Sequence, residues 1–173
     1  MNKTHKFFRA HIWISMAVLV SMIITACQKQ PNSQALNMEP IELLNECPIN
    51  IVNSDHEDHF MVINSPQELN KYIIFNDMDE QACDRLHEQL SIDFSRNTLL
   101  IGKKRLNAIQ GQLINQNVYR SGNDIVYNVT IKQGGYQAIG QFKFGVLIPK
   151  ISNDADVKFN VSFAADYKIK GQN

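Results

Sequence analysis

The sequence predicts a mainly β domain of the α+β class: an antiparallel sheet, folded into a sandwich or partial barrel, with one or two short helices packed on it. Three observations support this fold. After Ile92 the chain consists of short runs rich in Val, Ile, Phe, Tyr and Leu. Clusters of turn-forming residues, such as 121–124 and 152–154, separate these runs. Two segments before Ile92 carry the signals that start helices.

The first helix signal is the tetrapeptide Ser65-Pro66-Gln67-Glu68. Ser65 can cap the helix, and Pro66 suits the first helical position. Glu68 can return a hydrogen bond to the N–H of the capping residue. We therefore expect a helix over about 66–75.

A second helix is expected over about 79–90. The acidic segment 77–80 precedes Ala82, Leu86 and Leu90, which are spaced four residues apart and so fall on one side of a helix. This spacing places Cys83 on or near the buried face.

The remaining apolar runs predict strands. The longer runs are 98–106, 112–119, 125–132, 142–148 and 157–163, and the shorter candidates are 49–52 and 60–63. The alternation is clearest in 125–132, where Ile125, Tyr127, Val129 and Ile131 line one face while Asn128, Thr130 and Lys132 mark the other. This alternation is typical of a half-buried antiparallel strand.

The first 26 residues have the order of a secretory signal peptide. Lys3, Lys6 and Arg9 form a basic start without an acid, and an apolar run over 12–25 follows. A transmembrane helix is the alternative, but this run has only about 15 residues and a membrane span takes about 20.

The run ends on Ile24-Thr25-Ala26-Cys27, which resembles the lipobox of bacterial lipoproteins. The resemblance implies cleavage before Cys27 and attachment of acyl chains, such as palmitate, to that residue. Two or more acyl chains anchor a protein stably to a membrane. The alternative is an ordinary secretory signal in which the cysteine is incidental.

The polar segment 27–40 is expected to be a flexible tether, and 41–173 a single domain. In lipoproteins of bacteria with two membranes, an Asp after the lipidated cysteine retains the protein at the inner membrane. This chain has Gln28 there, so the resemblance implies the outer membrane, with the periplasmic face preferred.

The charge balance argues against nucleic acid as a partner. The chain has 17 Lys and Arg and 17 Asp and Glu, and the signal holds three of the basic residues, which leaves 14 against 17. The one basic cluster, 103–105, lies in a strand-like run and is typical of an exposed strand end.

Two cysteines remain once Cys27 is assigned to the lipid. In an oxidising compartment we expect Cys47 and Cys83 to form a disulfide, which would close a loop of about 36 residues and contribute about 4 kcal/mol in the chain-entropy model. Two separate buried thiols are the alternative, because the sequence does not show whether the two Cα atoms lie within bridging distance.

The densest polar cluster is 55–59, with the sequence Asp-His-Glu-Asp-His. His56, His59 and the carboxylates are ligand types that transition metals accept. A solvated turn between strands explains the same residues. The spacing matches no established zinc pattern, so we assign no metal and no cofactor. His87, on the second expected helix, is interpreted as a surface residue.

Gly134-Gly135-Tyr136 lacks the pattern of a phosphate-binding loop. Because it joins two strand-like runs, we expect its glycines to take positive φ in a long hairpin loop. Such a loop can also present Tyr136 to a partner. The chain contains no GxSxG or HExxH motif, and no catalytic residue is assigned.

A looser resemblance covers about 62–163. The segment 62–69, followed by 92–101, is similar to the opening of the PrcB-type domain, and 148–150 with 157–161 is similar to its closing strands. Domains of this family are secreted or lipid-anchored in bacteria, and the founding role is that of an accessory subunit that stabilises a protease complex. The family's Gly-Gly-aromatic turn is expected earlier in the chain than Gly134.

Together these features lead us to expect a non-catalytic, lipid-anchored envelope protein that acts as a binding or accessory module for another protein, with a protease complex as one such partner. The alternative is a metal-binding or hydrolytic envelope enzyme that uses His56, His59 and nearby carboxylates.

Overall fold

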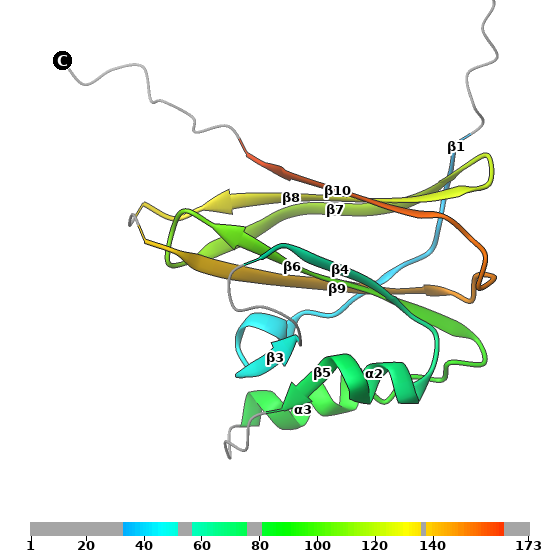
Figure 1. Cartoon of the computed structure of the whole chain (residues 1–173), viewed down its shortest axis with the longest axis horizontal. Helices are drawn as coiled ribbons and strands as arrows, with labels where there is room; N and C mark the ends of the chain where they lie inside the picture. Colours follow the sequence, from blue (N-terminus) through cyan, green and yellow to red (C-terminus); the bar gives the residue numbers. More distant parts are fainter. Residues whose placement is uncertain (1–32, 52–56, 76–80, 136–137, 165–173) are drawn as a thin grey trace, which may run out of the picture. The chain divides into compact units, whose positions relative to one another are not determined.

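The fold is taken from a computed structural model, which describes residues 33–51, 57–75, 81–135 and 138–164. These residues belong to one structural unit. They form a mainly β fold with two short α-helices, and the sheets do not close into a barrel (Figure 1). The predicted fold class is therefore confirmed.

Two four-stranded sheets form the body of the fold. The outer sheet has the order β1-β7-β8-β10, and its strands are β1 (Ser33–Ala35), β7 (Gly111–Ser121), β8 (Asp124–Gln133) and β10 (Val157–Phe163). The central sheet has the order β2-β9-β6-β4, and its strands are β2 (Glu39–Pro40), β9 (Gly140–Pro149), β6 (Asn97–Leu106) and β4 (His59–Ile63). Each long run that the sequence marked as a strand is a strand within a few residues of its predicted ends.

A third layer covers the other face of the central sheet (Figure 1). It contains the 3-10 turn η1 (Leu43–Asn45), the helices α2 (Pro66–Tyr72) and α3 (Gln81–Gln89), and a small antiparallel pair of β3 (Ile49–Ile51) with β5 (Ile73–Phe75). One core lies between the two large sheets, and a second lies between the central sheet and this layer.

The strand β6 is buried on both faces because it lies between these two cores. Leu100 and Leu106 pack toward the outer sheet, whereas Leu99 and Ile101 pack toward the helices. This explains why residues 99–102 of β6 form an unbroken apolar run, while β8, which has one solvated face, alternates.

One strand pair differs from the predicted antiparallel arrangement. β10 runs parallel to β8, in a register that places Phe159 opposite Tyr127. The chain reaches β10 from β9, which belongs to the other sheet, so it can enter the outer sheet in either direction. A parallel pair of this kind needs a long connection, and β9 supplies it.

Part of the segment 27–40, which was expected to be a flexible tether, pairs with the sheets. Ser33–Ala35 pairs with β7 and Glu39–Pro40 pairs with β9, so both segments belong to the sheets. Polar side chains do not prevent this pairing, because main-chain groups make the hydrogen bonds. The described part of the fold begins at Ser33 rather than at residue 41.

The first helix starts as predicted. The N–H of Glu68 donates to Ser65 Oγ over 3.2 Å, and Pro66 occupies the first turn. The Glu68 carboxylate accepts from the N–H of Asn64 (2.7 Å), one residue before the expected partner. The helix ends at Tyr72 because the apolar residues 73–75 pair with β3 instead.

The second helix, α3, also lies where it was predicted, although residues 76–80 are outside the described ranges. Leu86 and Leu90 are buried. Cys83 is buried as well and is bonded to Cys47, with the Cα atoms 5.1 Å apart. The predicted disulfide is thus present, and it joins the segment before β3 to α3.

Candidate functional site

The outward face of the outer sheet carries a group of uncharged polar side chains. On β8 the apolar residues Ile125, Tyr127, Val129 and Ile131 are buried, as their alternation predicted, and Asn128, Thr130 and Lys132 lie on the opposite, outward face. Residues in register on β7 and β10 share that outward face. We call the following group the asparagine face: Asn115 and Asn117 from β7, Asn128 and Thr130 from β8, and Asn160 and Ser162 from β10.

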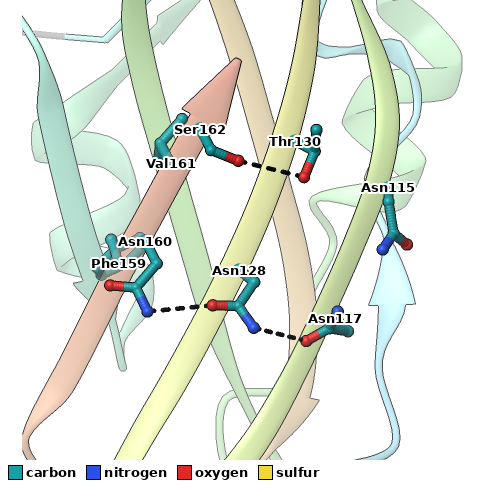
Figure 2. Close-up of a pocket in the computed structure, with 8 residues that line it drawn as sticks. All are labelled: Asn115, Asn117, Asn128, Thr130, Phe159, Asn160, Val161 and Ser162. Atoms are coloured by element: carbon teal, nitrogen blue, oxygen red, sulfur yellow. Dashed lines mark hydrogen bonds between the residues drawn. The ribbon is translucent and has the colours of Figure 1, made fainter. Parts of the chain in front are cut away.

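Hydrogen bonds link five of these six side chains, all except Asn115, across the three strands (Figure 2). Asn160 Nδ2 donates to Asn128 Oδ1 over 3.1 Å, and Asn128 Nδ2 donates to Asn117 Oδ1 over 3.0 Å. The hydroxyl oxygens of Thr130 and Ser162 lie 3.3 Å apart. The side chains therefore hold one another in position on the surface.

The asparagine face lines an open depression of about 610 Å³. This volume falls in the range of small-molecule sites, roughly 300–1,000 Å³. The depression is broad and open to solvent rather than enclosed, so its shape fits an extended ligand.

A β-bulge in β7 creates half of this face. Leu113 pairs with Ile131 on the inward side, but Asn115 pairs with Thr130 on the outward side, because one extra residue interrupts the register between them. Ile114 is left half-exposed at the bulge. Simple alternation from Leu113 would have turned Asn115 and Asn117 inward, so the sequence alone did not reveal this site.

Charged side chains lie at the margin of the asparagine face and pair with one another. The Lys158 ammonium donates to the Asp124 carboxylate, and this hydrogen bond raises the pKa of Lys158. The pair occupies the end of the sheet at which β8 and β10 begin. Within the face itself the hydrogen-bonding groups are amides and hydroxyls.

The strand β10 lies at the edge of the outer sheet, and one row of its main-chain groups has no strand partner among the described residues. The N–H of Ile125 donates to Asp156 O and the N–H of Ala164 donates to Ile131 O, both over 2.8 Å. Alternate residues of a strand face the same neighbour. The N–H and C=O groups of Val157, Phe159, Val161 and Phe163 therefore point away from β8, and no strand in the described ranges pairs with them.

Aromatic side chains lie under this edge, between the two sheets. Phe159 stacks on Phe60 of β4 with the ring centroids 5.4 Å apart. Phe163, at the end of β10, is 41% exposed, and the Lys104 ammonium lies 5.7 Å from the centroid of its ring. The open side of the sandwich is thus partly apolar.

The Gly-Gly loop differs from the prediction. It joins β8 to β9, which lie in different sheets, so it is not a hairpin. Gly134 and Gly135 do not take positive φ; in the described residues the glycine that does is Gly122, in the turn between β7 and β8. Positive φ is needed there because only two residues connect the two paired strands. Tyr136 lies outside the described residues.

The loop between β8 and β9 carries an exposed isoleucine, and the adjoining turn between β6 and β7 carries another. The N–H of Gly134 donates to Gln110 O over 2.9 Å, which holds the loop against the turn between β6 and β7. A Cβ on Gly140 would overlap the carbonyl oxygen of Ala108, so only glycine permits this approach. Ile109 and Ile139, on the two adjoining segments, are 58% and 59% exposed.

The residues of the 55–59 cluster that are described do not converge on a metal site. Asp55 and His56 lie outside the described residues. The Asp58 carboxylate accepts from the Lys104 ammonium and from the N–H of Arg105 (2.9 Å). Burial acts to raise the pKa of Asp58, but these contacts outweigh it and leave the pKa lowered. His59 begins β4 and lies in register with Lys103.

Metal-ligating residues do not form a group of three anywhere in the described ranges. His87, interpreted from the sequence as a surface residue, is exposed on α3, and its ring stacks on Phe75 with the centroids 3.7 Å apart.

The described groups with shifted pKa values lie in different parts of the fold. Burial raises the pKa of Tyr127, whose hydroxyl donates to Gln116 Oε1 in the core between the large sheets. Burial, together with the charge of Lys103, lowers the pKa of Lys143 in the central sheet. Asp93 and Asp154 are carboxylates at turns whose pKa values are lowered by hydrogen bonds from Ser95 and Ser152.

Cys27, the predicted lipid attachment point, is outside the described residues. Within them, none of the helices has the length and the apolar character that crossing a bilayer requires.

Comparison with known proteins assigns the chain to no group: no protein-family model, no curated protein and no solved structure matches it.

Proposed function

We propose that this protein is a non-catalytic, lipid-anchored binding module of the bacterial cell envelope, and that it binds another protein through the open edge of β10. The observation that carries the proposal is the row of N–H and C=O groups on Val157, Phe159, Val161 and Phe163, which point away from β8 and pair with no strand in the part of the chain that the structure describes. An edge of this kind accepts a further strand, because the main-chain groups of an added strand satisfy it.

The surroundings of the edge favour a protein segment as the occupant. A strand laid beside β10 would also cover the half-exposed Phe163 and the partly buried Phe60 and Phe159 beneath it. Side chains of the partner strand would meet this apolar surface on alternate residues. Main-chain hydrogen bonds would supply affinity, and the aromatic surface would supply selectivity.

The proposal of a non-catalytic role is supported by the separation of the titratable groups with shifted pKa values. Catalytic sites bring such groups together around one concave surface. In the described residues, Tyr127, Lys143 and Asp58 lie in the inter-sheet core, the central sheet and a surface loop, respectively.

The resemblance to PrcB-type domains suggests the class of partner, an envelope protease complex that the module would stabilise as an accessory subunit. The lipobox resemblance suggests how it is held there, through acyl chains on Cys27 at the outer membrane. A tethered accessory module needs no active site of its own.

The test is affinity capture of the full-length lipoprotein from membranes, with mass spectrometry of the proteins that co-purify. A variant Val161→Pro removes one outward N–H without removing a hydrogen bond to β8, because proline is tolerated where its missing N–H faces away from the sheet. The matched control Val161→Ala removes similar side-chain atoms but keeps the N–H.

We expect a protease subunit to be captured by the wild type and by Val161→Ala, and its recovery to fall about tenfold or more with Val161→Pro. Circular dichroism would verify that both variants fold. If both variants capture the partner equally well, the contact lies elsewhere in the fold. The variants Ile109→Ser and Ile139→Ser would then test the exposed isoleucines of the β6–β7 turn and the β8–β9 loop. The absence of any reproducible partner would overturn the proposal.

The anchor is tested separately with Cys27→Ser. We expect the variant to leave the membrane fraction after signal cleavage, whereas a variant that stays membrane-bound would show that the lipid anchor is wrong.

A further inference from the structure

We propose that the asparagine face is a binding site for a neutral carbohydrate chain, beside the protein contact at the β10 edge; the depression shares Phe159 and Val161 with that edge. The six side chains of the face offer only amide and hydroxyl groups, and they lie in a shallow, open depression on three adjacent strands (Figure 2). A ligand matched to such a surface carries many groups that both donate and accept hydrogen bonds and carries no net charge.

The direction of the hydrogen bonds leaves donors and acceptors free for such a ligand. Each amide nitrogen has two hydrogens, and the bonds from Asn160 to Asn128 and from Asn128 to Asn117 use one hydrogen of each donor. Among the described residues, the Nδ2 group of Asn117 and the Oδ1 atom of Asn160 at the two ends of the row take no part in these bonds. Sugar hydroxyls can bond to both kinds of group.

The same bonds arrange the side chains before a ligand arrives. Asn117, Asn128 and Asn160 are in register on neighbouring strands, so their amides form a row that spans two strand spacings, about 10 Å. Side chains that are already ordered lose little conformational entropy on binding. An extended ligand can therefore meet several positioned groups at once.

An aromatic ring lies beside the row. Tyr119 follows Asn117 by two residues on β7, about 7 Å farther along the strand on the same face, and it pairs with Val126 and Ala35. Tyr119 is half-buried and lies outside the lining of the depression. The C–H faces of sugar rings pack on aromatic surfaces while their hydroxyls bond to amides, so a chain that extends past the row toward Tyr119 would meet both kinds of contact.

The charge distribution disfavours the main alternatives. A phosphate or carboxylate ligand favours a cation in the site, and neither of the two nearby lysines lines the depression. Lys158 pairs with Asp124, and Lys132 lies two residues past Thr130 at the margin of the face. An apolar protein surface would desolvate the amide hydrogens and oxygens that the cross-strand bonds do not use, and each such group left without a partner costs free energy.

The experiment uses full-length protein in detergent and two neutral probes, the β-1,4-linked hexamers of N-acetylglucosamine and of glucose, with dextran sulfate as the charged comparison. Binding is measured by isothermal titration calorimetry. Asn128→Ala removes the central amide, which takes part in both cross-strand bonds. Gln112→Ala is the matched control, since Gln112 is exposed on the same strand face but outside the depression.

We expect at least one neutral hexamer to bind, with Asn128→Ala weakening binding about tenfold or more and Gln112→Ala leaving it unchanged. If Asn128→Ala fails to fold, Asn160→Ala on the edge strand serves as the second variant. The proposal is overturned if neither hexamer binds, if dextran sulfate binds in their place, or if binding is insensitive to Asn128 and Asn160. A different outcome would be that no saccharide binds, while sedimentation shows that the wild type self-associates and Asn128→Ala does not. That result would assign the face to a contact between copies of the chain.

Discussion

The side chain of Lys143 lies in surroundings that disfavour its positive charge. It lies on β9 opposite Lys103 of β6, and Asn45 binds its main chain by two hydrogen bonds, of 2.7 and 2.8 Å. Burial and the neighbouring ammonium both disfavour the protonated form and lower its pKa. The strand is fixed in place by the main chain, so the side chain cannot withdraw from this environment.

We predict that Lys143→Met is more stable than the wild type near neutral pH. Between the lowered pKa and the ordinary value of 10.5, the folded wild type binds fewer protons than the unfolded chain, so its free energy of unfolding rises with pH in that window. The free energy of unfolding of Lys143→Met does not rise in this way, so its stability advantage over the wild type should shrink as the pH approaches 10.5. Urea unfolding at several pH values measures this, with the exposed Lys132→Met as control; equal or lower stability of Lys143→Met at pH 7 would contradict it.

Gly102 gives a second prediction at this scale. A Cβ at this position would lie 2.6 Å from Phe144 and 2.8 Å from Phe60, both of which pack between the sheets. We expect Gly102→Ala to lower the free energy of unfolding by about 1–3 kcal/mol through overpacking. Gly135→Ala, where nothing lies within 4 Å, is the control in the same urea titration and should change little.

Some residue environments could not be predicted. The basic cluster 103–105 was interpreted as an exposed strand end, yet Lys103 is only 3% exposed. Arg105 is exposed, and Lys104 reaches Asp58. A lysine on a two-sided strand is placed by the layer that covers it, and that layer comes from distant parts of the chain.

At the scale of elements, local chemistry predicted most of the structure. The alternation in β8 and the capping residues of α2 each act within a few residues, so they are visible in the sequence. The early end of α2 was not visible, because residues 73–75 pair with β3, which is distant in the chain. The bulge in β7 was not visible either, since one extra residue leaves no compositional mark, and the asparagine face was missed with it.

The cap of α2 supplies a test at this scale. Ser65→Ala removes the acceptor for the Glu68 N–H, and we expect the free energy of unfolding to fall by about 1 kcal/mol. Ser91→Ala is a suitable control because Ser91 is exposed and follows α3 rather than starting a helix. A loss of the same size in both variants would show that the cap contributes nothing specific.

At the scale of the whole molecule, the disulfide connects two segments that do not pair with each other in a sheet. Cys47 lies before β3 and Cys83 lies on α3, so the bridge closes the layer over the central sheet. Its pairing could be predicted by counting cysteines. The three-layer arrangement could not, because the covering of both faces of β6 depends on where distant segments pack.

We expect the double variant Cys47→Ser/Cys83→Ser to lose about 4 kcal/mol of unfolding free energy, as the chain-entropy model gives for a separation of 36 residues. Urea unfolding without reductant measures this loss. Wild type in reductant should lose a similar amount, and a double variant as stable as the oxidised wild type would contradict the prediction.

The alternation within β10 has a consequence for regulation. Its odd-numbered residues direct their main-chain groups out of the edge, and its even-numbered side chains, Asn160 and Ser162, belong to the asparagine face. A partner strand and a carbohydrate would thus contact the same seven-residue segment. Thermodynamic linkage then requires reciprocity: whatever factor the saccharide imposes on the affinity for the partner, the partner imposes on the affinity for the saccharide.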